Sequence, residues 1–300
     1  MTLHDAFNYF LAAKRINCSP RTIDWYEQRI GKFIAWLEAM RIGSDWVRPE
    51  TIEAYLANER DSGLSPATVL ASYTALRSFL GWLKKRKYLS ENPLELVERP
   101  STPERPPRRA LLNDVQQLIR SIPRGSWVDL RDRAIVQSML ATGMRLGDVA
   151  SLWVSDVDLD SRWIYIRAGK NDKDRYAPFD RASKEELTLY LLARPQWHGP
   201  ELFVAATGHL NVAGSMTGNA IRVMMRRRCV KAGVDVINPH ALRHLFATKA
   251  LNEGVSLAAV STILGHHSPA FTAKVYAKWV KSGLRAEYDA AWGKGNIEGI

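Results

Sequence analysis

Residues 238–244 read Asn-Pro-His-Ala-Leu-Arg-His, and this stretch predicts the beginning of a helix. Asn238 is a favourable N-cap residue, and Pro239 suits the first helical position because its φ is already helical and its missing N–H is not needed there. On such a helix, His240 and Arg243 lie one turn apart near the N-terminus. A histidine at a helix start can also have a purely structural role.

A metal site at this helix is not expected. His240 and His244 have the i,i+4 spacing of a metal-binding pair, but the helical zinc-protease motif needs Glu directly after the first histidine, and this chain has Ala241. The two cysteines, Cys18 and Cys229, lie too far apart in the chain for a zinc motif or a disulfide framework.

Three other segments place charged or reactive side chains at the ends of expected elements. In the first, an apolar helix ends at a Thr-Gly pair, and a new helix begins at Arg145 with Asp148 on the same face. The second, residues 169–175, reads Gly-Lys-Asn-Asp-Lys-Asp-Arg and is typical of a charged hairpin tip. The third, residues 264–269, reads Leu-Gly-His-His-Ser-Pro and is soon followed by Tyr276. Each segment alone also fits a structural role, as a cap, a solvated turn or a core aromatic.

The charge of the chain indicates a polyanionic partner. Among 300 residues, 42 are Lys or Arg and 31 are Asp or Glu, a formal net charge of +11. Such an excess favours nucleic acid or an anionic surface, and it lies mainly in the C-terminal two-thirds. No apolar run is long enough to span a membrane, and the first residues lack the basic start of a signal peptide. We therefore expect a cytoplasmic, nucleoid-associated protein with no membrane partner.

The pattern of helix signals and prolines predicts two domains. Residues 1–98 read as helices, with Ser-Pro starts at 19–20 and 65–66 and a shorter helix over 50–61. Residues 99–109 contain four prolines and four arginines and predict an extended basic linker. Residues 110–300 form the second expected domain.

That second domain is expected to be mainly helical with a small antiparallel sheet. We expect strands over 153–155, 163–167 and 175–178. The expected helices of this domain, from the spacing of apolar residues, cover 113–121, 129–141, 182–193, 217–232, 239–252, 257–264 and 269–279, with a further segment near 282–292.

Taken together, the motifs resemble the tyrosine recombinases, the phage-integrase-like and Xer-like enzymes of DNA strand exchange. The resemblance covers nearly the whole chain and rests on six residues in family order: Arg145, Lys170, His240, Arg243, His266 and Tyr276. It implies a helical, SAM-like core-binding domain before the linker and a catalytic domain after it. It also implies a two-domain form without a further N-terminal DNA-binding domain.

The resemblance implies a role for each residue. Arg145 and Arg243 would clamp the non-bridging phosphate oxygens, because guanidinium forks stabilise the charge of a pentavalent transition state. Tyr276 would attack the phosphate and form a 3′-phosphotyrosyl bond without cofactor or metal. Lys170 would protonate the leaving 5′ oxygen. His240 would accept or manage the tyrosine proton, and His266 would donate a hydrogen bond to the phosphate. Asp148 would orient Arg145 or His240 without reacting itself.

Some assignments have rivals in the sequence. Lys173 competes with Lys170 as the general acid, His267 with His266, and Tyr288 with Tyr276. Asp148 stands where many relatives carry Glu. The expected DNA contacts outside the catalytic set are Lys84, Lys85, Arg86, Lys87, Arg105, Arg108, Arg109, Lys173 and Arg175.

The expected partner is a duplex DNA recombination site, bound by a homotetramer assembled on two sites, with an accessory protein left open. Two other functions share parts of the pattern. A DNA-binding regulator on the same scaffold would not need Tyr276, and a type IB topoisomerase would use the same phosphotyrosyl chemistry.

Overall fold

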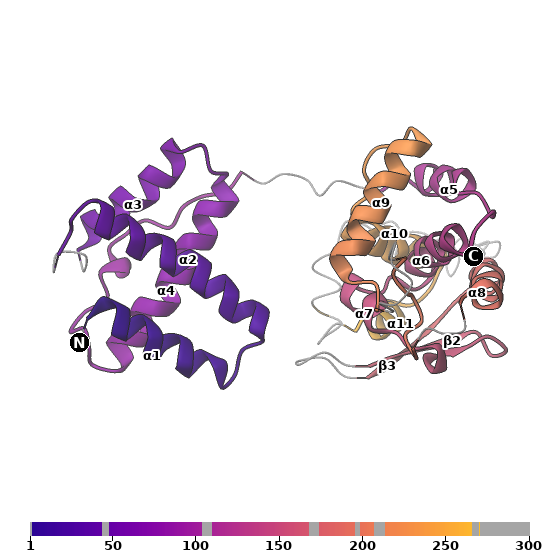
Figure 1. Ribbon diagram of the computed structural model, residues 1–300, viewed down its shortest axis with the longest axis horizontal. Helices are drawn as coiled ribbons and strands as arrows, with labels where there is room; N and C mark the ends of the chain where they lie inside the picture. Colours follow the sequence, from indigo (N-terminus) through magenta and orange to yellow (C-terminus); the bar gives the residue numbers. More distant parts are fainter. Residues whose placement is uncertain are drawn as a thin grey trace, which may run out of the picture. The chain divides into compact units, whose positions relative to one another are not determined.

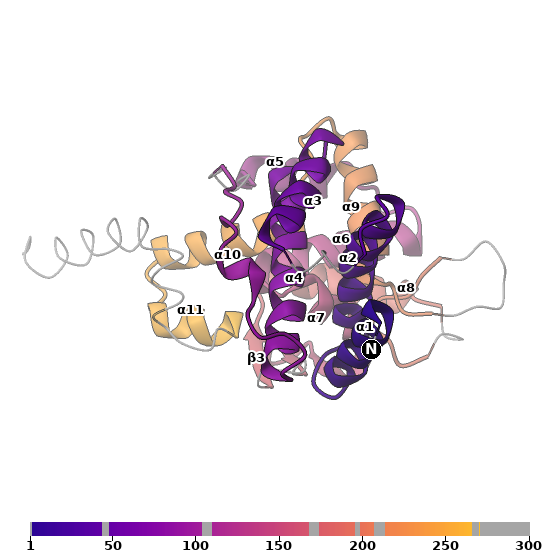
Figure 2. The ribbon, with the colours of Figure 1, turned by 90° about the vertical axis from the view of Figure 1, so that its left-hand side faces the viewer.

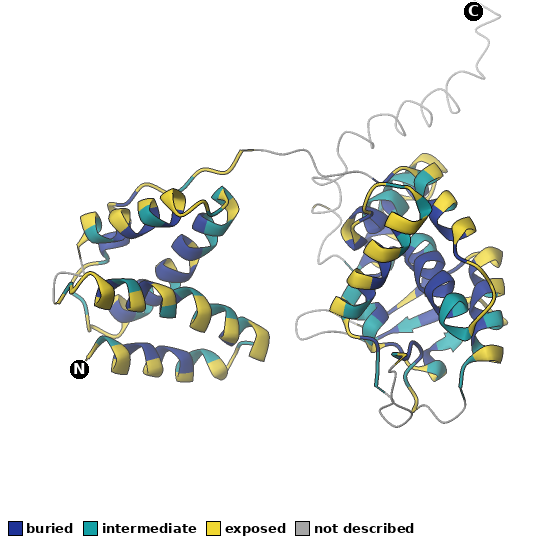
Figure 3. Cartoon of the chain, turned by 45° about the horizontal axis from the view of Figure 1, so that its top comes forward, coloured by how far each residue is buried: buried dark blue, intermediate teal, exposed yellow. Residues whose placement is uncertain are grey.

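The computed structural model describes residues 2–43, 48–103, 110–167, 174–195, 199–206, 214–265 and 270. The chain forms two units, residues 1–106 and 107–300, which are described separately (Figure 1). In both units, buried residues lie on the sides of the helices that face the interior of the unit, and exposed residues lie on the outer sides (Figure 3).

The N-terminal unit is helical, as predicted. It contains α1 (Leu3–Arg15), α2 (Pro20–Ala39), α3 (Pro49–Asp61), α4 (Pro66–Lys85) and a 3₁₀ turn, η2 (Pro93–Glu95). The Ser-Pro pairs start α2 and α4 as expected: Ser19 Oγ accepts the N–H of Thr22, and Ser65 Oγ accepts that of Thr68. The helix α4 contacts the other three helices, so its apolar face organises the core of this unit.

Aromatic side chains fill that core. Phe10 of α1 meets Phe79 of α4 edge to face at 5.3 Å between ring centroids, and Phe33 of α2 meets Tyr55 of α3 in the same way at 5.0 Å. Cys18 is half-buried and packs against the same core.

The C-terminal unit is built around one central helix. Its helices are α5 (Leu112–Ser121), α6 (Trp127–Thr142), α7 (Leu146–Ser151), α8 (Arg181–Ala193), α9 (Gly218–Ala232), α10 (Pro239–Asn252) and α11 (Leu257–Leu264). All residues of α6 from Arg131 to Met139 are buried, and α6 contacts α5, α8, α9, α10 and the sheet. Cys229 of α9 lies fully buried in this core.

A three-stranded antiparallel sheet packs against the helices. Its strands are β1 (Val157–Asp158), β2 (Trp163–Ile166) and β3 (Arg175–Pro178), in the order β1-β2-β3. Ile164 and Ala177 form a cross-strand pair on the buried face, whereas Tyr165 and Tyr176 pair on the other face. The strands β2 and β3 confirm the expected hairpin.

The predicted strand over 153–155 is wrong. Trp153 makes only an isolated bridge with Glu201, and Val154–Asp156 form a 3₁₀ turn, η3. The Asp156 carboxylate accepts the N–H of Trp153 at 2.7 Å and so holds this turn. The first strand therefore begins two residues after the expected one ends.

The helices α10 and α11 lie side by side, which brings the beginning of α10 near the end of α11 (Figures 1 and 2). The expected helix over 269–279 and the segment near 282–292 lie outside the described residues, apart from Ala270, which is helical.

Candidate active site

A tight turn after α6 positions Arg145. Gly143 ends α6 with φ of +61°, a conformation that residues with a side chain rarely adopt. A Cβ atom on Gly143 would lie 2.5 Å from Cδ1 of Phe246 and 2.8 Å from Cδ2 of Leu264, so the turn presses directly on α10 and α11. Arg145, two residues later, is the N-cap of α7.

Arg243 is buried and bridges two chain segments. It lies on the first turns of α10, where its Nη1 donates to the carbonyl of Gly143 at 2.8 Å and its Nη2 to that of Leu264 at 2.7 Å. The side chain thus joins the turn before Arg145 to the end of α11. Holding a guanidinium in this way fixes its plane, which the recognition of a phosphate requires.

Arg145 reaches the same helix end. Its Nη2 donates to the carbonyl of Gly265, the residue that follows α11, at 3.1 Å. The predicted pair of arginines, far apart in the chain, therefore converges on two neighbouring carbonyl groups. This is an arrangement that can place two guanidinium groups around one anion.

Asp148 holds the beginning of α7. Its Oδ2 accepts the backbone N–H of Arg145 at 3.0 Å and also forms an ion pair with Arg175 of β3. The carboxylate therefore orients Arg145 through its backbone, as an N-terminal cap does.

His240 lies one turn before Arg243 and is exposed. Its backbone N–H donates to Oδ1 of Asn238 at 3.0 Å, which confirms the predicted start of α10. An exposed imidazole beside a buried arginine is open to a ligand. His244, the other half of the rejected metal pair, is half-buried on the same helix.

Several predicted residues lie outside the described part of the chain. They are Lys170 and Lys173 of the hairpin tip, His266, His267, Tyr276, Tyr288 and the linker residues Arg105, Arg108 and Arg109. His266 directly follows Gly265, whose carbonyl accepts from Arg145.

The expected DNA contacts of residues 84–87 lie at the exposed end of α4. Lys84 Nζ forms an ion pair with Glu95 at 3.0 Å, and the guanidinium of Arg86 stands 5.7 Å from the ring centroid of Trp82. Lys85 and Lys87 are also exposed. The positive charge of Lys84 is therefore paired with the Glu95 carboxylate before any ligand binds to this cluster.

Arg175 is placed differently from the expectation of a DNA contact. Its side chain is only 5% exposed and is paired with Asp148, so it is turned into the protein rather than toward the surface. The correction follows from the strand pattern, because Arg175 occupies an inward-facing position of β3.

The helix α9 has a basic face that was not among the residues predicted from the sequence. Arg222, Arg226, Arg227 and Lys231 of this helix are all exposed. Arg222 and Arg226, and likewise Arg227 and Lys231, are four residues apart, a spacing that indicates a cationic helix face from the sequence alone.

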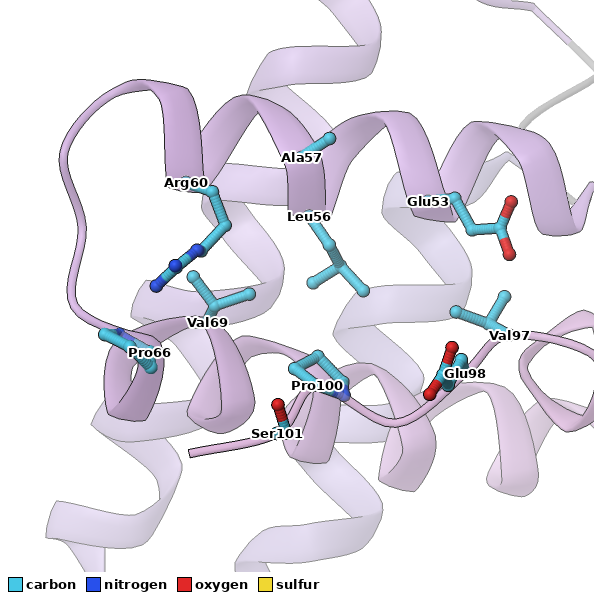
Figure 4. A pocket seen from close by; sticks show the side chains of 10 residues that line it. All are labelled: Glu53, Leu56, Ala57, Arg60, Pro66, Val69, Val97, Glu98, Pro100 and Ser101. Atoms are coloured by element: carbon cyan, nitrogen blue, oxygen red, sulfur yellow. The ribbon is translucent and has the colours of Figure 1, made fainter. Parts of the chain in front are cut away.

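The part of the chain that the structure describes contains no group of three or more His, Cys, Asp or Glu side chains that could hold a metal ion. Among the same residues, no helix has the length and apolar character needed to cross a bilayer. A cavity of about 320 Å³ lies in the N-terminal unit, between α3 and residues 97–101 (Figure 4). None of its lining residues belongs to the candidate site, which lies in the other unit.

Comparison with known proteins shows the family to which this chain belongs. The profile of the phage integrase family matches residues 109–282, and that of the phage integrase N-terminal SAM-like domain matches residues 5–87. The tyrosine recombinase XerC of Bacillus subtilis (strain 168) is 32% identical over 281 residues, which are 91% of this chain and 90% of that protein. The chain belongs to the phage integrase family. It is a site-specific recombinase of the tyrosine type, and the resemblance seen in its motifs is confirmed.

Other members of the family agree with this assignment. Tyrosine recombinase XerD of Listeria innocua is 29% identical over 298 residues, covering 95% of this chain and 97% of that protein. The crystal structure of XerA recombinase matches with a TM-score of 0.53 and 28% identity over 96% of this chain and 98% of that one. The XerH site-specific recombinase, solved on its palindromic difH substrate, shares the fold with a TM-score of 0.70 at 20% identity, covering 92% of this chain and 80% of that one.

Proposed function

We propose that this recombinase cuts and rejoins duplex DNA through Tyr276, by way of a 3′-phosphotyrosyl intermediate. The observation that carries the proposal is the convergence of Arg145 and Arg243 on the carbonyls of residues 264 and 265. The chain continues from this point into His266 and Tyr276. The carbonyl groups that hold the two arginines therefore directly precede the segment that contains the proposed nucleophile.

The residues present can carry out each step of the exchange. Attack by the Tyr276 oxygen on phosphorus forms the phosphotyrosyl bond as the bond to the 5′ oxygen breaks, and the reverse attack by a 5′ hydroxyl rejoins the strand. Arg145 and Arg243 stabilise the charge on the non-bridging oxygens. His240, exposed beside Arg243, accepts the tyrosine proton, Lys170 protonates the leaving oxygen, and His266 donates to the phosphate. No step needs ATP or a metal ion, because the covalent bond conserves the energy of the phosphodiester.

The remaining basic surface would hold the DNA backbone. Lys85, Arg86 and Lys87 at the end of α4, the arginines of the linker and the exposed face of α9 supply cationic side chains in both units. Contacts of this kind give affinity and position rather than sequence selection. We further propose that four protomers assemble on two recombination sites. The architecture leaves open a requirement for an accessory protein.

The nucleophile can be tested on a nicked duplex that carries a binding site selected from random DNA. Wild-type protein is expected to form a covalent adduct that survives denaturation, in EDTA as well as in magnesium. Tyr276→Phe removes one oxygen and should abolish the adduct while DNA binding is unchanged. Tyr288→Phe is the matched control and should leave it intact.

The same assay separates the other possible functions. A regulator would bind the site and form no adduct with any strand. A topoisomerase would relax supercoiled DNA that lacks the selected site. An adduct that survives Tyr276→Phe, or that maps to Tyr288 by peptide analysis, would overturn the assignment of the nucleophile.

A further inference from the structure

The end of α11 binds three arginines rather than two. The carbonyl of Ile263 accepts from Arg175 Nε at 2.9 Å, that of Leu264 from Arg243 Nη2, and that of Gly265 from Arg145 Nη2. Carbonyl groups in the last turn of a helix lack partners within the helix and lie at the negative end of its dipole. Three guanidinium groups from three different segments satisfy three successive carbonyls here.

Arg175 is buried, as Arg243 is. Its second partner is the carboxylate of Asp148. The same carboxylate oxygen accepts the backbone N–H of Arg145 at 3.0 Å. Arg175 therefore connects β3, the beginning of α7 and the end of α11, which are far apart in the sequence.

Gly265 allows Arg175 to approach this closely. It has φ of +67°, and a Cβ atom at this position would lie 3.0 Å from Cδ and 3.1 Å from both Nε and Nη1 of Arg175. The turn that leads from α11 to residue 266 thus packs directly on the Arg175 guanidinium. A shift of either group would be transmitted to the other.

We propose that Arg175 is a positioning residue for the phosphate clamp. Its two contacts fix the beginning of α7 relative to the end of α11, and so keep the guanidinium groups of Arg145 and Arg243 arranged for a single phosphate before DNA binds. Because Arg175 is buried and bonded to Asp148 and to the carbonyl of Ile263, we assign it a supporting role rather than a contact with the phosphate. The inference rests on the proposed function, because it assigns a role within that same site.

The geometry predicts which substitutions fail. Arg175→Lys leaves one nitrogen in place of the fork, and a single nitrogen cannot occupy both the Nε position at Ile263 and the Nη2 position at Asp148. Arg175→Gln would also leave the Asp148 carboxylate without its cationic partner. Both variants should misplace Arg145 slightly, and a small misplacement of a catalytic group costs about 10- to 100-fold in rate.

The experiment compares binding with chemistry on the selected nicked duplex. Arg175→Gln and Arg175→Lys should lower the single-turnover rate of adduct formation by about 10- to 100-fold. Their affinity for the DNA should change by less than about threefold, because binding rests on many phosphate contacts elsewhere. Arg181→Gln, an exposed arginine at the beginning of α8, is the matched control and should change neither quantity.

A second substrate distinguishes positioning from general loss of structure. A methylphosphonate at the scissile position replaces one charged non-bridging oxygen with a neutral methyl group, so less transition-state charge remains for the clamp to stabilise. If Arg175 acts through Arg145 and Arg243, the defect of Arg175→Gln should be several-fold smaller on this substrate. A defect of equal size on both substrates would overturn the proposal.

The path through Asp148 is tested by a double substitution. Asp148→Asn, Arg175→Gln and the double variant should lose similar amounts of activity, because all three break the same connection. Fully multiplicative losses would contradict it. If Arg175→Gln unfolds, Arg175→Lys, which keeps the positive charge, provides the same comparison between the two substrates.

The outcomes also separate this inference from the proposed function. If wild-type protein forms no adduct that depends on Tyr276, the proposed function fails. If wild-type protein forms that adduct and Arg175→Gln forms it at the same rate, the role of Arg175 alone is rejected.

Discussion

At the scale of single residues, the backbone conformation and the surroundings of Gly143 leave no room for a side chain. Its carbonyl accepts from Arg243, and its backbone occupies the left-handed region against Phe246 and Leu264. Gly143→Ala should lower the free energy of unfolding by at least about 1 kcal/mol from backbone strain alone, and the contact with Phe246 adds to this loss. Urea denaturation measures it.

Gly147 offers the comparison for that substitution. It is exposed within α7, and a Cβ atom there would meet no other group within 4 Å. Gly147→Ala should therefore stabilise the protein by about 0.5–1 kcal/mol. Equal effects of the two substitutions would show that the turn at Gly143 is not under the constraint described.

The sequence predicts some of the site residues and not others for a physical reason. Local spacing places His240 and Arg243 on one turn, because both belong to the same helix start. The position of Arg175 depends on Asp148 and on the carbonyl of Ile263, which is 88 residues away in the chain. No local sequence pattern contains that contact. The sequence around a buried arginine in a charged hairpin therefore looks the same as that around an exposed one.

At the scale of elements, an ion-pair cluster joins α6 to α8. Arg133 of α6 donates to Glu186 of α8 at 2.6 Å, and both side chains are buried, while the exposed Arg124 contacts the same carboxylate at 2.8 Å. Removing one partner leaves a buried charge without compensation. Glu186→Gln should therefore cost about 3 kcal/mol of stability, measured by chemical denaturation.

Glu185 is the matched control for this cluster. It is 59% exposed and pairs with Arg124 at the surface, so Glu185→Gln should cost less than about 1 kcal/mol. Similar losses for the two variants would contradict the importance of burial.

The same cluster predicts a response to acid. Burial alone would raise the pKa of Glu186, but hydrogen bonds from Arg133 and Arg124 outweigh it and hold the pKa below the ordinary value of 4.5. The stabilisation is therefore fully present above about pH 4.5 and is lost as the pH falls through the lower pKa of the folded state. Glu186→Gln should show a smaller loss of stability between about pH 5 and pH 3 than wild-type protein.

The elements that the sequence predicts well have their signals in the chain itself. Both Ser-Pro helix starts and the β2–β3 hairpin lie where expected, because caps and strand alternation are local. The failed strand over 153–155 depends on a distant segment instead: the Val154 N–H donates to the carbonyl of Pro200, and Trp153 bridges to Glu201. Apolar and β-branched residues favour a strand, and the cap by Asp156 overrides that preference.

At the scale of the whole molecule, the distribution of charge predicts how DNA binding responds to salt. The exposed face of α9 includes Arg222 and Arg226, one turn apart. If both contact phosphates, the double variant Arg222→Gln/Arg226→Gln should reduce the slope of log affinity against log salt by about two. The pair Arg120→Gln/Arg181→Gln, also exposed, should leave the slope unchanged.

The two cysteines, one per unit, give each unit its own chemical reporter. Cys18 is half-buried in the N-terminal unit, whereas Cys229 is fully buried in the C-terminal core, where burial raises the pKa of its thiol. A thiol reagent should therefore modify Cys18 readily and Cys229 only when α9 opens from the core. The labelling rates of the two thiols, measured at increasing urea concentrations, would report the opening of each unit separately within one intact chain. If α9 faces bound DNA, DNA should slow the modification of Cys229.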